Sequence, residues 1–159
     1  MAAPEWAIAL EHSGVGTWMR SAELAYPVVN VLHLLGLTLL IGPMLLLDLR
    51  LMGFGRRFSL PDVSAVLTPL SIVGILILTL SGVLLFSADA GPLIQNRLLL
   101  IKLVLIAIAL INAVVFRLSW QPRLSTWDRQ APLPGRLQAA ASITLWLAVG
   151  ALGRWIAYV

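Results

Sequence analysis

The sequence predicts an all-α integral membrane protein, a four-helix bundle preceded by a short N-terminal interfacial helix. Of its 159 residues, 60% are hydrophobic and only 11% are charged, and the mean hydropathy is +0.95. In soluble domains about a quarter of the residues are charged. Four apolar runs are long enough to cross a bilayer, which takes about 20 helical residues. A single transmembrane domain, residues 1–159, is therefore expected.

The N-terminal segment, residues 4–20, is predicted to be a short helix lying in the membrane interface and anchored by Trp6 and Trp18. It has no continuous apolar core, so it does not have the pattern of a cleavable signal peptide. Gly14 and Gly16 are expected to break its helical run.

Four crossings are predicted, over residues 22–53, 60–86, 93–118 and 136–158. The second crossing carries small residues at helical spacing. Such residues allow membrane helices to approach closely. They are Ser71, Gly74, Ser81 and Gly82.

Basic residues are distributed unevenly between the two sides of a four-crossing chain. The first and third loops share one side and hold Arg50, Arg56, Arg57, Arg117, Arg123, Arg129 and Arg136. The other side holds Arg20, Arg97, Lys102 and Arg154. Cytoplasmic loops carry the excess of Lys and Arg, so the first and third loops are predicted to be cytoplasmic and both termini to lie on the opposite side.

Polar side chains inside the crossings define the candidate site, because ionisable groups in a membrane are costly and commonly functional. His33 is the only histidine within a predicted crossing. In the predicted topology His33, Lys102 and Arg154 lie within roughly 6 to 16 Å of the outer surface. The polar intramembrane layer is predicted to consist of Tyr26, Asn30, His33, Lys102, Asn112 and Arg154.

Several short motifs together carry a family resemblance. They are His33-Leu-Leu-Gly36, Asp48-Leu-Arg-Leu-Met-Gly53, Ser81-Gly82, Phe86-Ser-Ala-Asp89-Ala, Lys102, Asn112 and Gly153-Arg-Trp-Ile-Ala-Tyr158. As a set they resemble an uncharacterised family of small bacterial four-helix integral membrane proteins, over most of the chain beyond Tyr26. More loosely, the chain is similar to the membrane parts of copper-resistance D proteins and of b-type cytochromes.

The resemblance implies a small multi-pass membrane protein and no particular activity. The expected location is the bacterial inner (cytoplasmic) membrane, with both termini periplasmic as the arginine count predicts. Relatives often have a histidine after the Asn and Phe of the third helix, where this chain has Arg117. That difference weighs against any scheme that takes a second ligand from this helix end.

One functional hypothesis is haem b binding, with His33 as an axial ligand. Lys102 and Arg154 would then meet the haem propionates, and His12 would supply the second ligand if the N-terminal segment folded back over the bundle. A second hypothesis is a pathway for protons or a small polar solute along His33, Asn30, Lys102 and Asn112.

The third hypothesis, which we favour, is a non-catalytic accessory component of a larger inner-membrane assembly, either with other membrane subunits or as a homo-oligomer. Beside all three stands a purely structural interpretation: His33 bonds a helix neighbour, Lys102 and Arg154 extend to water, and Asp48 pairs with Arg50 at a helix end.

Several functions are excluded or disfavoured by the sequence. The absence of cysteine removes thiolate metal sites and iron–sulfur clusters, and no metal site is predicted. No nucleophile elbow, phosphate loop or metalloprotease motif is present, so catalytic activity by the chain alone is not expected. Its arginines flank apolar runs instead of gathering on a soluble face, so the lipid bilayer is expected to be its surroundings and nucleic acid is not expected as a partner.

Overall fold

The computed structural model describes residues 3–158 and is built from helices. In order, the elements are α1 (Glu5–Glu11), α2 (Gly14–Ser21), α3 (Ala25–Leu51), α4 (Leu60–Ala88), α5 (Ala90–Gln95), α6 (Arg97–Trp120), the 3-10 helix η1 (Gln121–Thr126), α7 (Leu133–Trp155) and η2 (Ile156–Tyr158). Four of them, α3, α4, α6 with η1, and α7, are long and apolar enough to cross a membrane. The predicted all-α, four-helix architecture of a multi-pass membrane protein is confirmed.

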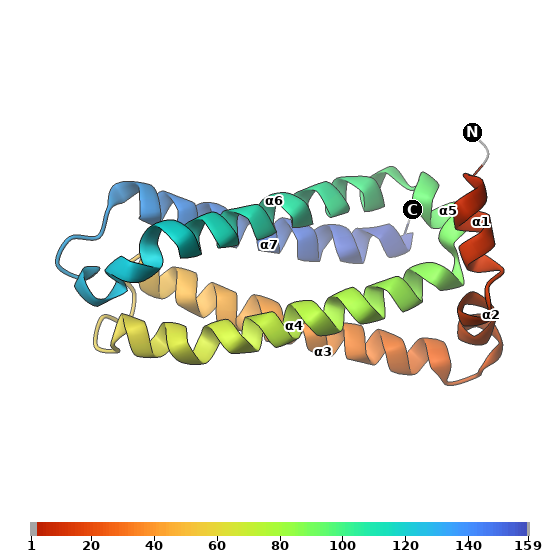
Figure 1. Cartoon of the computed structure of the whole chain (residues 1–159), viewed down its shortest axis with the longest axis horizontal. Helices are drawn as coiled ribbons and strands as arrows, with labels where there is room; N and C mark the ends of the chain where they lie inside the picture. The colour runs from red at the N-terminus through yellow and green to blue at the C-terminus, as the bar shows by residue number, and fades with distance from the viewer. Residues whose placement is uncertain (1–2, 159) are drawn as a thin grey trace.

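The bundle consists of two hairpins, α3–α4 and α6–α7, which lie side by side (Figure 1). The hairpins are joined mainly by packing between α3 and α7, while α4 reaches the second hairpin through η1. One end of the bundle carries the α3–α4 turn and η1, and is called the loop end below. The other end carries α1, α2 and α5, and is called the N-terminal end (Figure 1).

The α3–α4 hairpin is held by a close backbone approach at two glycines. A Cβ atom added to Gly74 would lie 2.6 Å from the backbone nitrogen of Leu40, and one added to Gly36 would lie 3.1 Å from the carbonyl oxygen of Gly74. A Cβ atom at Gly74 does not fit, and one at Gly36 would require its neighbours to shift, so these two glycines serve the contact between α3 and α4. These residues are therefore used for packing within the chain.

The N-terminal segment contains two helices, where one was predicted. The chain turns at His12 and Ser13, and the Ser13 hydroxyl caps α2 by accepting the Gly16 amide at 3.2 Å. Gly14 and Gly16 therefore lie inside α2, and the prediction that they break a helix is wrong. A Cβ atom at Gly16 would lie 2.6 Å from the carbonyl oxygen of Ser87, so this glycine permits α2 to pack on the end of α4.

The two short helices lie across the N-terminal end of the bundle (Figure 1). Met19 of α2 is buried against Ala25, Val29 and Ala88. The Glu11 carboxylate of α1 accepts the Gly91 amide of α5 at 2.9 Å. The segment is thus fastened to the bundle by both apolar and polar contacts.

The helix bounds differ from the prediction mainly at the third and fourth crossings. The third begins at Arg97 instead of residue 93, because Asn96 caps α6 by accepting the Leu98 amide at 2.9 Å and leaves α5 as a separate helix. The fourth covers Leu133–Trp155, against the predicted residues 136–158. α3 and α4 fall within three residues of the bounds predicted for them.

Candidate functional site

His33 lies in the interface between α3 and α4. Its Nδ1 atom is 2.8 Å from the Ser81 hydroxyl oxygen, and that hydroxyl also donates to the Ile77 carbonyl at 2.6 Å. Since the single hydroxyl proton of Ser81 is used on Ile77, the His33 Nδ1–H is the donor to Ser81. In the neutral ring Nε2 then carries the lone pair. Gly82 makes room for the ring, because a Cβ atom there would lie 3.4 Å from His33 Cε1.

Lys102 shares the layer of His33. It reaches from α6 toward α7, where its ammonium nitrogen lies over Gly153, 3.1 Å from the position of an added Cβ atom. The glycine at position 153 thus leaves room for the lysine head group between the two helices.

Arg154 is at the N-terminal end of the bundle but is exposed. Its guanidinium group donates to the Tyr158 hydroxyl and lies 4.8 Å from the centre of that ring. Tyr26 is also exposed and Asn30 is half-buried. Of the predicted layer, Asn30, His33 and Lys102 are half-buried, whereas Tyr26 and Arg154 are exposed.

Asn112 lies at a different depth, so its inclusion in the polar layer needs correction. Its amide donates to the Gln138 carbonyl at 3.3 Å, and the Gln138 amide donates to the Asn112 carbonyl at 3.1 Å. The Gln138 side-chain oxygen also accepts from the Trp120 indole at 2.9 Å. Ten residues separate Asn112 from Lys102, about 15 Å along the helix. The prediction took account of the helix face that Lys102 and Asn112 share, but not of their different depths along the helix.

His12 is exposed at the C-terminal cap of α1. Nothing in residues 3–158 brings its side chain to His33, which packs between two other helices. The structure thus places the two histidines on separate elements.

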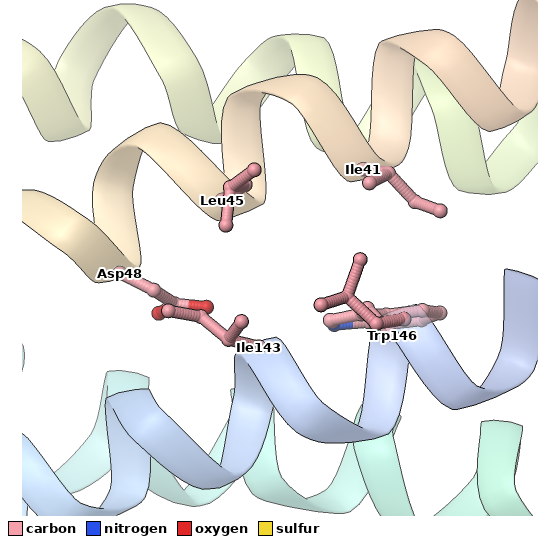
Figure 2. Close-up of a pocket in the computed structure, with 6 residues that line it drawn as sticks. Ile41, Leu45, Asp48, Ile143 and Trp146 are labelled. Atoms are coloured by element: carbon pink, nitrogen blue, oxygen red, sulfur yellow. The ribbon is translucent and has the colours of Figure 1, made fainter.

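A second polar cluster, centred on Asp48, was not predicted. Asp48 is only 4% exposed and faces α7, where Ser142 (2% exposed) and Trp146 (4% exposed) are also buried. Asp48 Oδ2, Ser142 Oγ and Trp146 Nε1 have no hydrogen-bond partner among the described residues. Figure 2 shows the Asp48 side chain reaching from α3 toward α7, with Trp146 beside the same space.

The space at Asp48 is a small cavity, with apolar walls that include Ile41, Leu45 and Ile143. The centre of a water molecule has about 10 Å³ available in it. Asp48 and Trp146 line this cavity; a carboxylate oxygen accepts and an indole N–H donates, so the two groups match the hydrogen-bonding capacity of one water molecule. The indole N–H and the shortage of oxygen ligands make the same site unsuitable for a metal cation.

Arg50 does not pair with Asp48, contrary to the structural interpretation of the sequence. Two residues apart on a helix, they lie on opposite faces. Arg50 is 4% exposed and forms a two-pronged ion pair with Asp128, at 2.8 and 2.6 Å, while its Nε donates to the Phe58 carbonyl at 2.9 Å. The hydrogen bonds and the charge of Arg50 hold the pKa of Asp128 below its usual value.

Trp127, next to Asp128, closes the loop end of the bundle. It is 2% exposed, and its indole donates to the Leu51 carbonyl at 3.0 Å. Phe116 and Trp120 pack against its ring, with centroids 5.9 and 6.0 Å away. In the sequence, the position of Trp127 between a Pro-containing loop and a helix end gives no signal of burial.

Comparisons with known proteins connect the chain to one family and to no described activity. No curated protein and no solved structure matches it. A family model does match residues 10–159, nearly the whole chain. The match includes α3, α4, α6 and α7, and therefore the His33 layer and the Asp48 cluster. The chain belongs to DUF6644, a family of unknown function.

Proposed function

We propose that this protein is a non-catalytic component of the bacterial inner membrane that works as an accessory subunit of a larger membrane assembly. The observation that supports this proposal is the incomplete packing of α6. In a closed four-helix bundle each helix packs on two neighbours. Here only 6% of the apolar stretch of α6 is buried, against 22% to 28% in the other three long helices.

The uncovered side of α6 is long and apolar. Val104, Ile111 and Val114 are 60%, 62% and 57% exposed, and they follow one another along the helix. Lipid tails are as apolar as these side chains, so a partner helix would be held here by shape and close packing. A helix of another subunit, or of a second copy of this chain, would give α6 the second neighbour that a bundle helix normally has.

The polar residues of the bundle interior support a structural role for the chain itself. His33 is bonded to Ser81, and Asn112 to Gln138. Both contacts join neighbouring helices. The pathway hypothesis has less support, because Asn112 is engaged at a different depth from His33 and Lys102.

The proposal is tested by site-specific photo-crosslinking in native membranes, with the crosslinker at Val104 or Ile111 of α6. Val31 of α3, 64% exposed and also apolar, is the matched control. Each α6 position should give a discrete product containing a second membrane protein or a second copy of this chain, and Val31 should not. The same featureless lipid labelling at all three positions would exclude a partner on α6.

Haem b binding is the second candidate function, and the contact of His33 Nδ1 with the Ser81 hydroxyl is the observation that favours it. A histidine that ligates iron through Nε2 normally donates its Nδ1–H to a fixed acceptor, which orients the ring. Ser81 is such an acceptor for His33. Lys102 in the same layer would suit a propionate, whereas His12 would have to leave the cap of α1 to provide a second ligand. This candidate ranks second for that reason.

A further inference from the structure

A groove at the loop end of the bundle runs between α4, the C-terminal end of α6 and η1. Its volume is about 540 Å³. The groove exists because α4 meets the second hairpin through η1 and not along α6. It is separate from the Asp48 cavity, which lies between α3 and α7.

Along the α4 wall of the groove, the hydrogen-bonding side chains come first and the larger apolar side chains follow. Ser64 and Thr68 follow the start of α4 at Leu60 by four and eight residues, about 6 and 12 Å along the helix. Ile72 and Val73 lie about 18 to 20 Å from that start. A polar mouth near the membrane boundary therefore leads into an apolar interior, which is the order of head group and acyl chain in a lipid.

Arg117 gives the mouth of the groove a positive charge. It is exposed, lies three residues before the end of α6, and lines the groove together with Gln121 and Ser125. No carboxylate is among the lining residues. Two other arginines at this end are engaged, since Arg50 is held by Asp128 and Arg123 lies 5.4 Å from the Trp120 ring centre. A cation at the membrane boundary, facing a groove without acidic groups, is complementary to an anion.

Hydrogen-bonding groups line the same groove as Arg117. Ser64 and Thr68 lie 3.3 Å apart, oxygen to oxygen, and are half-buried in the groove wall. The two hydroxyls carry two protons, and the hydrogen bond between them uses one. The other proton is available to a further acceptor. Together with the Gln121 amide and the Ser125 hydroxyl they provide the kind of donors that bind phosphate oxygens.

We propose that this groove binds one anionic phospholipid, with the phosphate at Arg117 and an acyl chain lying along α4 past Thr68. The charge and the hydrogen-bonding groups of the lining favour a lipid over an apolar helix, because they are complementary to a phosphate. The site is distinct from the partner face on the middle of α6, so either proposal can fail without the other.

The test measures lipid retention by the purified protein, using native mass spectrometry after reconstitution in vesicles of dioleoylphosphatidylglycerol or dioleoylphosphatidylcholine. Wild-type protein should retain one phosphatidylglycerol molecule in preference to phosphatidylcholine. Arg117→Gln should weaken this retention about tenfold, the effect of losing one charge-assisted hydrogen bond. Arg117→Lys keeps the charge and should retain most of it.

Arg57→Gln is the matched control, because Arg57 is exposed at the same end, stacks on Phe58 and does not line the groove. It should bind phosphatidylglycerol as the wild type does. Val73→Trp fills the apolar part and should reduce retention of both lipids. Equal losses in Arg57→Gln and Arg117→Gln would overturn the proposal, as would unchanged retention in Arg117→Gln or displacement of the lipid by millimolar inorganic phosphate.

Discussion

Arg50 and Asp128 meet through two parallel hydrogen bonds, 2.8 and 2.6 Å long, although 78 residues separate them in the chain. Arg50 is buried at the end of α3, and Asp128 lies in the loop between η1 and α7. The ion pair therefore attaches the loop of the α6–α7 hairpin to the α3–α4 hairpin. Trp127 supports this attachment through its bond to Leu51.

The Arg50–Asp128 pair makes stability dependent on acid pH. The pKa of Asp128 is lower in the folded protein than in the unfolded chain, because Arg50 donates to the carboxylate and attracts its charge. The stabilisation is therefore complete above the unfolded value of about 3.9 and is lost as the pH falls through the folded value. Thermal melting of wild type and Asp128→Asn should differ at pH 7, and the difference should begin to shrink at about pH 3.9 and vanish below the lower folded pKa of Asp128.

The size of the Asp128→Asn effect at pH 7 is expected to be about 1 kcal/mol, since the Asp128 side chain is 43% exposed and solvent screens the pair. Asp62→Asn is the control, an exposed carboxylate at the same end of the bundle. A pH-independent difference between wild type and Asp128→Asn would show that the ionised carboxylate is not the stabilising species.

The sequence was sufficient to predict the four crossings, because each is a long apolar run bounded by polar or turn-forming residues. It was not sufficient to predict which polar residues meet. Asp48 and Arg50 are neighbours in the sequence, yet helical periodicity turns them to different partners. Asn112 and Lys102 share a face but not a depth, and the partner of Asn112, Gln138, comes from a helix whose register is set by packing. The two-helix N-terminal segment was missed because Ser13 acts as a cap only when the chain can turn against α4.

Replacing Asp48 by Leu is expected to raise stability. A buried carboxylate without an ionic partner is costly, and apolar replacement of buried charged groups is often neutral or stabilising by about 1–4 kcal/mol. The adjoining cavity leaves room for the added methyl groups. Denaturant titration in detergent measures the change. A clear loss of stability would instead mean that Asp48 is held by polar contacts, such as a water shared with Ser142 and Trp146.

Gly74 and Gly42 form a matched pair for testing the α3–α4 contact. Both glycines are inside long helices, but a Cβ atom at Gly74 would lie 2.6 Å from Leu40 N, whereas one at Gly42 would have nothing within 4 Å. Gly74→Ala should lower the free energy of unfolding by about 1–3 kcal/mol through overpacking. Gly42→Ala should raise it by up to about 1 kcal/mol, because alanine favours the helix. Thermal melts of the two variants in one detergent would decide, and equal melting temperatures would contradict the close approach.

The proposed topology, with both termini periplasmic, is tested by reporter fusions. The arginine asymmetry predicts cytoplasmic signals after Arg57 and near Arg129, and a periplasmic signal near Asp89. Matched fusions with a reporter active only in the cytoplasm and one active only in the periplasm give each site two readings. The opposite pattern would place the His33 layer toward the cell interior and the Arg117 groove toward the periplasm.

His33 is the residue that separates the haem hypothesis from a structural role. If haem b is bound, protein expressed with haem available should show a Soret band that His33→Ala abolishes. Ser81→Ala should shift or weaken the band, because the ring would lose the acceptor that orients it. His12→Ala reports whether the N-terminal segment supplies the second ligand.

If the wild-type protein is colourless, the haem hypothesis fails and the test becomes one of stability. Ser81 would keep its bond to the Ile77 carbonyl in His33→Ala, so no buried hydroxyl is left unpaired, and the expected cost is about 1 kcal/mol. A colourless His33→Ala protein that melts like a colourless wild type would leave His33 with neither role.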